Sequence, residues 1–229
     1  MIGIIGAMAS EVDALKDAML DKDIKTIGVT EYCAGTLCGT RVVVAQSGVG
    51  KINAALCAQN MIHAYAPRLI INTGCAAGVG DGLHVGDIVI AKDAVQHDLD
   101  YGPLNYERGF IEGIKMVHIP AHKAYSERIA AIAEQLGIHT RIGTVATGDQ
   151  FLSDPVKKQD IKDYFHAEAV EMEGGAIAHA ACANGVPFVI LRSISDSGDD
   201  EAVNDFSAFA AKVNEINRQI LKQFLEGEQ

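Results

Sequence analysis

The stretch from Arg41 to Thr73 reads RVVVAQSGVGKINAALCAQNMIHAYAPRLIINT and gives the clearest indication of the fold class. Its first and last segments, 41–46 and 69–73, are short apolar runs typical of buried strands. The amphipathic stretch between them, 52–66, favours a helix. Because apolar runs and amphipathic stretches alternate along the rest of the chain, we predict an α/β sheet covered by helices.

The remaining elements follow from the same two patterns. The turn at Cys38-Gly39-Thr40 joins two neighbouring strands as a hairpin, so we expect a mixed sheet rather than a purely parallel one. Strands are predicted at 2–5, 26–34, 41–46, 69–73, 87–94, 115–119, 141–146, 169–172 and 188–193. Helices are predicted at 11–20, 52–66, 123–136, 155–164, 176–184 and 205–225. The sequence has no internal repeat, low-complexity tract or linker, so we expect one domain over residues 1–229.

Composition restricts the classes of partner. The 229 residues are 48% apolar and 21% charged, which is typical of a folded globular protein, and the formal net charge is −11. Binding to nucleic acid or to an anionic membrane needs a cluster of basic residues, so we expect neither partner. The five cysteines form no CxxC pair, and the sequence has no signal peptide and no run long enough to span a bilayer. We therefore expect a cytoplasmic protein with reduced thiols and neither a disulfide nor a zinc site.

The chemistry is expected at one edge of the sheet. In open α/β sheets, ligands bind beyond the carboxyl ends of the parallel strands. This rule places five segments near one rim: 6–10, 74–80, 148–152, 172–175 and 195–198. Three of these segments carry acidic residues with no obvious partner. The irregular segment 96–113 is a loop of a length that usually serves function or an interface.

Several familiar motifs are incomplete. QSGVGK at 46–51 lacks the first glycine and the final Ser or Thr of a P-loop, and Ala45 also excludes a GxSxG nucleophile turn. The spacing of the glycines at 78–82 does not match the dinucleotide motif GxGxxG. A metal site competes with an ordinary polar loop at His97, Asp98 and Asp100, and we expect no metal there.

The first candidate acid lies near the start of a predicted helix. Ser10 is a plausible N-cap, which makes Glu11 the first helical residue. The positive helix end favours an ionised carboxylate, so we expect a lowered proton affinity for Glu11. An ionised glutamate at a pocket rim acts as a general base on water. The alternative is that Glu11 only complements the helix dipole.

Two further acids interrupt an apolar run. Glu171 and Glu173 would share one face if the predicted strand continues through both. Acids in such a place are costly unless something binds them, and paired hydroxyl groups match the acceptor oxygens of a carboxylate. The alternative is an internal salt bridge, for example with Arg192.

The fourth acid follows a buried strand. The run 188–191 is apolar, and Asp196 lies where the chain leaves it for the rim. A partly desolvated carboxyl group there keeps its proton near neutrality and serves as a general acid. The alternative is a turn or N-cap aspartate.

These segments together resemble a known superfamily. The matching strings are GIIGAM at 3–8 with Glu11, SGVGK at 47–51, IINTG at 70–74, VGDIV at 85–89, His97-Asp98, Gly148-Asp149 with Phe151, VEME at 170–173 and RSISD at 192–196. They run in order over nearly the whole chain. The sequence resembles the nucleoside phosphorylase/nucleosidase superfamily, and within it the methylthioadenosine/S-adenosylhomocysteine nucleosidases. The resemblance implies a three-layer α/β/α fold with a mixed central sheet.

The resemblance also implies an activity and roles for residues. It implies hydrolysis of the N-glycosidic bond of 5′-methylthioadenosine and S-adenosylhomocysteine, with Asp196 protonating N7 of adenine and Glu11 activating water. Met172 and Glu173 would hold the ribose, Phe151 and Leu152 would contact the base, and Phe206 would wall the pocket. The full set of implied substrate contacts is Ala77, Phe151, Leu152, Glu171, Met172, Glu173, Ser195 and Phe206. No metal or cofactor is implied, and a homodimer is implied, for which the 96–113 loop is our candidate at the interface.

Departures from the family pattern and alternative functions stay open. Cys75 stands where the family usually has serine, which weakens or replaces a hydrogen bond expected to the catalytic aspartate. Ala77 replaces a usual glycine. A phosphorylase needs cations to hold phosphate, whereas Asn72 occupies the place where related phosphorylases carry arginine, and Glu11 would repel phosphate. A futalosine-type nucleosidase, a purine nucleoside phosphorylase and a non-catalytic nucleoside-binding protein remain the alternatives.

Overall fold

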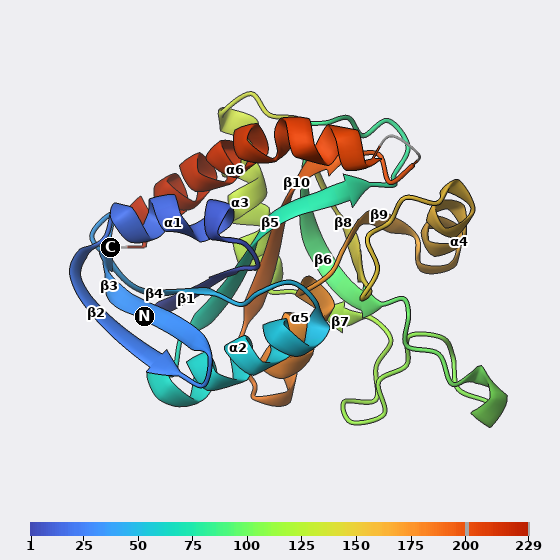
Figure 1. Cartoon of the computed structure of the whole chain (residues 1–229), viewed down its shortest axis with the longest axis horizontal. Helices are drawn as coiled ribbons and strands as arrows, with labels where there is room; N and C mark the ends of the chain where they lie inside the picture. Colours follow the sequence, from blue (N-terminus) through green and yellow to red (C-terminus); the bar gives the residue numbers. More distant parts are fainter. Residues whose placement is uncertain (200–201, 229) are drawn as a thin grey trace.

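The structure is a computed structural model that describes residues 1–199 and 202–228. The strands of these residues join one sheet with helices on both faces (Figure 1). The strands are β1 (Ile2–Gly6), β2 (Leu20–Ile27), β3 (Thr30–Leu37), β4 (Thr40–Gln46), β5 (Leu69–Gly78), β6 (Ile88–Gln96), β7 (Ile119–Pro120), β8 (Thr140–Thr147), β9 (Ala167–Glu171) and β10 (Phe188–Asp196). The helices are α1 (Ala9–Asp17), α2 (Lys51–Tyr65), the 3-10 helix η1 (Gly102–Leu104), α3 (Lys123–Gln135), α4 (Pro155–Phe165), α5 (Gly174–Ala183) and α6 (Ala202–Glu226).

Strand β5 is the junction of the sheet. It pairs in parallel with β1 and β10 and antiparallel with β9. Because β10 also pairs with β6, which leads through β8 to β9, the strands β5, β10, β6, β8 and β9 close into a ring. Strands β4, β3 and β2 extend the sheet beyond β1, with a hairpin between β3 and β4. The predicted mixed sheet is confirmed.

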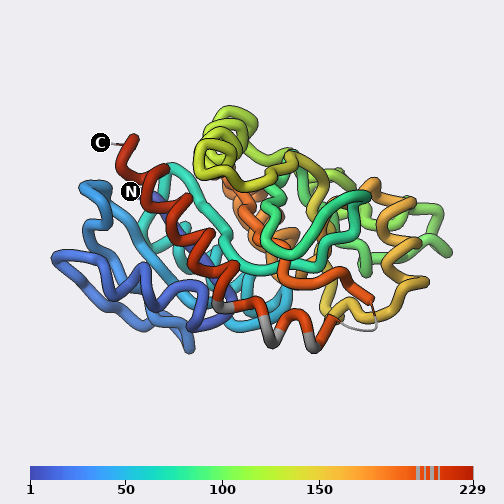
Figure 2. Tube along the Cα trace, turned by 90° about the horizontal axis from the view of Figure 1, so that it is seen from above, coloured from blue at the N-terminus to red at the C-terminus, as the bar shows by residue number. Residues whose placement is uncertain are grey.

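Two sets of helices form the outer layers. Helices α1, α3 and α6 pack on one face, where Leu15, Ile129 and Phe224 join the apolar side chains of the strands. Helices α2 and α5 pack together on the other face, around Met61 and Ile177. Figure 1 shows the two sets on opposite sides of the sheet, and Figure 2 shows α6 crossing the first face. The predicted three-layer α/β/α architecture is therefore confirmed.

The sequence-based prediction was wrong between residues 18 and 37. It extended the first helix to residue 20 and placed a single strand at 26–34, whereas α1 ends at Asp17 and β2 and β3 form a hairpin around Gly28, whose φ is 63°. Strand β2 has no buried side chain, and Leu20 and Ile24 are exposed. It therefore lacks the alternating apolar face that indicates a strand.

A second error lies at the predicted strand 115–119, of which only Ile119 belongs to a strand, the two-residue β7. Residue 116 forms an isolated bridge with residue 111 instead. The other predicted strands and helices agree with the structure to within three residues at each end, except that β5 continues five residues beyond its predicted end at residue 73. Among the described residues, no helix is long and apolar enough to cross a bilayer.

Candidate active site

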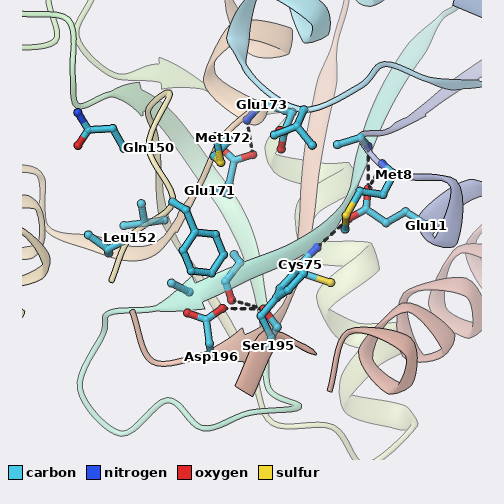
Figure 3. A pocket seen from close by; sticks show the side chains of 17 residues that line it. Met8, Glu11, Cys75, Gln150, Leu152, Glu171, Met172, Glu173, Ser195 and Asp196 are labelled. Carbon is cyan, nitrogen blue, oxygen red and sulfur yellow. Dashed lines mark hydrogen bonds between the residues drawn. The ribbon is translucent and has the colours of Figure 1, made fainter. Parts of the chain in front are cut away.

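Residues from the carboxyl ends of five strands enclose a cavity of about 230 Å³ (Figure 3). The segments predicted to meet at one rim, those at the ends of β1, β5, β8, β9 and β10, all contribute to it. The structure brings together all ten predicted site residues: Glu11, Ala77, Phe151, Leu152, Glu171, Met172, Glu173, Ser195, Asp196 and Phe206. Sequence reasoning assigned no substrate contact to the other lining residues, Ala7, Met8, Val49, Cys75, Ala76, Gln150 and Val170. Most of these are small or apolar, so their types carry no signal of a site.

Asp196 is the last residue of β10, and its side chain is buried beside the cavity. Its Oδ2 accepts a hydrogen bond from Ser195 Oγ (2.9 Å), and its Oδ1 accepts one from the Gly198 backbone N–H (2.9 Å). Burial raises the pKa of Asp196, and this effect outweighs the two hydrogen bonds. The direction agrees with the acid expected from the sequence. The bond to Gly198 also fits the alternative interpretation of Asp196 as a turn aspartate.

Glu11 enters the cavity from α1 (Figure 3). Met8 is the residue that precedes this helix, and Ser10 lies inside it, so the predicted Ser10 cap is wrong and Glu11 is the third helical residue. The Glu11 Oε2 accepts hydrogen bonds from the backbone N–H groups of Ala7 (2.7 Å) and Met8 (3.0 Å). The backbone N–H groups of the two residues just before the helix thus converge on this one oxygen.

The proton affinity of Glu11 differs from the sequence expectation. Its Oε1 accepts a weaker hydrogen bond from the Cys75 backbone N–H (3.3 Å). Burial nevertheless raises the pKa of Glu11, because desolvation outweighs the attraction of Arg192 and the backbone N–H groups. The expected lowering by the helix dipole was therefore wrong in direction. A carboxylate with a raised pKa is a stronger base toward water.

Glu171 takes part in a buried ion pair. Arg192, which is 1% exposed, donates to Glu171 Oε2 and to Asn72 Oδ1. The same Glu171 oxygen accepts from the backbone N–H groups of Glu173 (2.9 Å) and Gly174 (2.7 Å). Strand β9 ends at Glu171, so the strand does not continue through Glu173 and the condition for a shared strand face is not met. Glu171 therefore fits the alternative interpretation, in which the acid forms an internal salt bridge with Arg192.

Glu173 is freer than Glu171 to bind a ligand. It precedes α5, and its Oε1 accepts a hydrogen bond from the Gly50 backbone N–H (2.9 Å). The carboxylate lies 3.7 Å from Arg192. Burial, together with the nearby charge of Glu171, raises the pKa of Glu173. Met172 lies between the two acids in sequence and lines the cavity beside them.

The wall next to Asp196 is largely apolar. The rings of Phe151 and Phe206 lie edge to face with centroids 5.9 Å apart. Leu152 and Ala77 line the same cavity. A pocket with an apolar aromatic wall and carboxylates near it suits a flat aromatic base joined to a hydroxylated sugar.

Cys75 lines the cavity, but its side chain forms no hydrogen bond with Asp196. Its thiol donates to Asn214 Oδ1 on α6 (3.2 Å), while Ser195 provides the hydroxyl that binds Asp196. The expected hydrogen bond from position 75 to Asp196 is therefore replaced. Burial, and to a lesser extent the Glu11 charge, raises the pKa of the Cys75 thiol to about 12, so the thiol stays protonated.

Cations are absent from the cavity wall, as far as the structure describes it. Arg192 lies behind the wall, where Glu171 and Asn72 occupy its guanidinium. The described residues also contain no cluster of His, Cys, Asp and Glu that could hold a metal ion. In the loop that contains His97, Asp98 and Asp100, the Asp98 carboxylate pairs with Lys51 at 2.6 Å.

The buried pair leads to a prediction about stability. Replacing Arg192 by methionine is expected to lower the free energy of unfolding by about 3–5 kcal/mol, because Glu171 would keep a buried charge without its partner. The double variant Arg192→Met with Glu171→Gln should recover part of this loss, since position 171 no longer carries a charge. Urea unfolding at neutral pH measures both variants. A loss below about 1 kcal/mol in the single variant would show that the pair behaves like an exposed one.

Comparison with known proteins assigns the chain to a family. The family model described as "Phosphorylase superfamily" matches residues 1–226, and the chain belongs to this superfamily. The 5′-methylthioadenosine/S-adenosylhomocysteine nucleosidase of Shewanella oneidensis is 39% identical over 226 residues, which cover 98% of this chain and 96% of that protein. Within the superfamily, the chain is a member of the family of these nucleosidases, which are N-glycosyl hydrolases.

Solved structures agree with this assignment. The nucleosidase of the same name from Neisseria meningitidis, solved in complex with methylthio-immucillin-A, has a TM-score of 0.95 and 31% identity, covering 99% of this chain and 98% of that one. A futalosine hydrolase mutant of Helicobacter pylori has a TM-score of 0.93 and 30% identity, with coverage of 99% and 98%. The two similarities are close enough that the fold alone does not choose between the two activities.

Proposed function

We propose that the protein hydrolyses the N-glycosidic bond of 5′-methylthioadenosine and S-adenosylhomocysteine, releasing adenine and the 5′-thio-substituted ribose. Asp196 is the general acid on N7 of adenine, and Glu11 is the base that takes a proton from the attacking water. Met172 and Glu173 hold the ribose, with Glu173 on its hydroxyl groups. The observation that carries the proposal is the placement of Asp196 and Glu11 at one cavity, each with a raised pKa.

The steps follow from the charges of these groups. Protonation of N7 by Asp196 turns adenine into a neutral leaving group, and the sugar that remains develops the positive charge of an oxocarbenium ion. The carboxylates of Glu11 and Glu173 line the same cavity and stabilise that charge. Water then attacks C1′ of the sugar as Glu11 accepts its proton, which forms a hydroxyl group at C1′ in place of the bond to adenine and completes hydrolysis.

The cavity supports hydrolysis over phosphorolysis. A phosphorylase must hold an anion beside the sugar, for which arginine is the usual ligand. The described wall carries the carboxylates Glu11, Glu171 and Glu173 and no arginine or lysine. Phosphate would therefore be repelled at the place where water is accepted.

A single assay separates the enzymatic alternatives from a binding protein. The purified protein is incubated with methylthioadenosine or S-adenosylhomocysteine in phosphate-free buffer, and adenine release is followed. We expect release from both substrates at a rate that added phosphate does not increase. A strict requirement for phosphate would indicate a phosphorylase, and binding without turnover would indicate a nucleoside-binding protein.

Futalosine hydrolysis is the second candidate, because a futalosine hydrolase from Helicobacter pylori is among the similar structures. The two activities require the same acid and base and differ in the substituent at the ribose 5′ position. Measuring kcat/KM for futalosine beside methylthioadenosine decides which substrate is preferred. A higher value for futalosine would replace the first proposal.

We further propose a homodimer in the cytoplasm, with the loop 96–113 at the interface. This loop exposes Leu104 (69%) and Tyr106, and α2 exposes Ile52 (73%) and Leu56. Large exposed apolar side chains of this kind mark interaction surfaces. Light scattering should give the mass of two chains in solution, and the mass of one chain would contradict the dimer. The cytoplasmic location is supported by a cysteine set that suits a reducing compartment.

A further inference from the structure

Three short motifs that the proposed chemistry does not use meet beside the cavity. They are SGVGK at 47–51, His97-Asp98 and Gly148-Asp149. Lys51 begins α2, His97 directly follows β6, and Gly148 directly follows β8. Segments far apart in the sequence therefore lie together, and the contacts between them indicate what the motifs do.

Lys51, Asp98 and Asp149 close a ring of hydrogen bonds. The Lys51 backbone N–H donates to Asp149 Oδ1 (2.7 Å), and the Asp149 backbone N–H donates to Asp98 Oδ2 (2.9 Å). Asp98 Oδ1 then accepts from Lys51 Nζ (2.6 Å). The side chains of Lys51 and Asp98 are only 16% and 22% exposed, so their ion pair is partly shielded from water. Burial alone would raise the pKa of Asp98, but Lys51 and the Asp149 N–H lower it.

The ring holds the residue that binds Glu173. Gly50 directly precedes Lys51, and its backbone N–H donates to Glu173 Oε1 (2.9 Å). Gly50 has a φ of 95°, which favours glycine, and a Cβ atom there would lie 3.1 Å from Asp149 Oδ1. The chain therefore runs close to Asp149 just where it presents its N–H to Glu173.

His97 and Gly148 support the same junction. A Cβ atom at Gly148 would lie 2.3 Å from His97 Nε2, so the imidazole ring packs directly on the Gly148 backbone. The His97 backbone N–H also donates to the Thr147 carbonyl (2.9 Å). The packing of the His97 ring on the backbone requires glycine at position 148. The next residue, Asp149, accepts the hydrogen bond from the Lys51 backbone N–H.

The Glu173 carboxylate needs such support. It faces the negative charges of Glu171 and Glu11, and Arg192 is mainly occupied by Glu171. The Gly50 N–H is a neutral donor that favours one orientation of Glu173. Its position depends on the loop 48–50, which the ring joins to the segments after β6 and β8.

We propose that Lys51, Asp98 and Asp149 are positioning residues, which hold the Gly50 N–H against Glu173 and so orient this carboxylate toward the ribose hydroxyls. The inference rests on the proposed function, because it takes ribose as the ligand of Glu173. An ion pair near the surface contributes little to folding stability. A displacement of about 1 Å at a reacting or orienting group, however, reduces activity up to about 100-fold.

The kinetic test compares Lys51→Met and Asp98→Asn with the wild-type protein on methylthioadenosine and its 2′-deoxy and 3′-deoxy analogues. In both variants we expect KM for methylthioadenosine to rise about tenfold with a smaller change in kcat. The preference over at least one deoxy analogue should fall by about the same factor, because that analogue lacks a hydroxyl that Glu173 binds. Added to Glu173→Gln, either substitution should cause less than about a further twofold loss. Equal losses on all three substrates, or full additivity with Glu173→Gln, would overturn the inference.

A control variant and crystal structures of the two variants distinguish a positioning role from a general effect of losing a surface ion pair. Lys162→Met is the matched control, since Lys162 pairs with Asp81 at 2.5 Å and neither residue lines the cavity; its kinetics should equal those of the wild type. Crystal structures of Lys51→Met and Asp98→Asn need no turnover, and the distance from Gly50 N to Glu173 Oε1 should exceed about 3.5 Å in them. A retained contact would overturn the positioning role. If the wild-type protein releases no adenine, the proposed function fails, while this distance still decides the positioning role.

Discussion

Replacing Asp196 by asparagine is expected to lower kcat for adenine release from methylthioadenosine about 1,000-fold or more, while KM changes less than about threefold. The amide has the shape of the carboxyl group but no acidic proton to transfer to N7. Adenine would then have to leave as an anion, which raises the barrier of bond cleavage. Single-turnover assays with excess protein measure this step separately from product release.

The loss should not arise from unfolding. Because burial raises the folded-state pKa of Asp196, this group contributes stability below its unfolded-state pKa, and that contribution is lost as the pH rises through the raised folded-state pKa. At neutral pH the asparagine variant should therefore have a Tm at or above that of the wild type. The Gly198 N–H still has an oxygen to bind, and Ser195 Oγ turns to accept from the amide. Asp163→Asn, on the exposed surface of α4, is the control and should leave kcat unchanged.

The pH profile tests the proposal that Asp196 is the acid. A general acid acts in its protonated form, so wild-type kcat/KM should fall as the pH rises above the raised pKa of Asp196. Glu11 acts in its ionised form, so kcat/KM should also fall as the pH drops below its raised pKa. Asp196→Asn should remove the fall at high pH and retain the fall at low pH. Loss of the fall at low pH in this variant would contradict the assignment.

The buried strands were the part of the fold most open to prediction. Strands β1 and β4 and the first part of β10, residues 188–191, are mainly apolar and buried on both faces, so their sequence alone indicates buried strands. Strand β2 lies at the sheet edge with its side chains exposed, and its mixed polar sequence does not indicate a strand. The closure of five strands into a ring could not be predicted, because it depends on pairing between strands far apart in the chain.

The candidate site, like the fold, could be predicted only in part from the sequence. The acids at positions 171, 173 and 196 were detectable because carboxylates within or after apolar runs need a partner or a function. Which acid pairs with Arg192 could not be decided, since that depends on where β9 ends and how α5 begins. The pKa direction for Glu11 was missed because the sequence indicates that a helix begins near this residue, whereas the burial that outweighs the helix dipole is not visible in the sequence. The ring of Lys51, Asp98 and Asp149 joins three loops and exists only in the folded chain.

Replacing Glu11 by glutamine is expected to lower kcat about 100- to 1,000-fold with substrate binding retained. The amide oxygen at the Oε2 position keeps the hydrogen bonds from Ala7 and Met8, while the amide nitrogen faces the weaker donor, Cys75 N–H. The side chain therefore stays in place but no longer accepts a proton from water. Equilibrium binding of an uncleavable substrate analogue and single-turnover kinetics measure the two effects separately. Asp13→Asn, an exposed acid on the same helix, should leave both unchanged.

A substrate with a different leaving group separates the base from the acid. A riboside of para-nitrophenol needs no proton on departure, so Asp196→Asn should cleave it within about tenfold of the wild-type rate, whereas Glu11→Gln should remain slow. The contrast arises because bond cleavage no longer needs Asp196, while attack by water still needs a proton acceptor. If Glu11→Gln regained activity on this substrate and Asp196→Asn did not, the two assignments would have to be exchanged. Equal recovery of both variants would instead remove Glu11 from the attack of water, leaving the carboxylate only an electrostatic role beside the positive sugar.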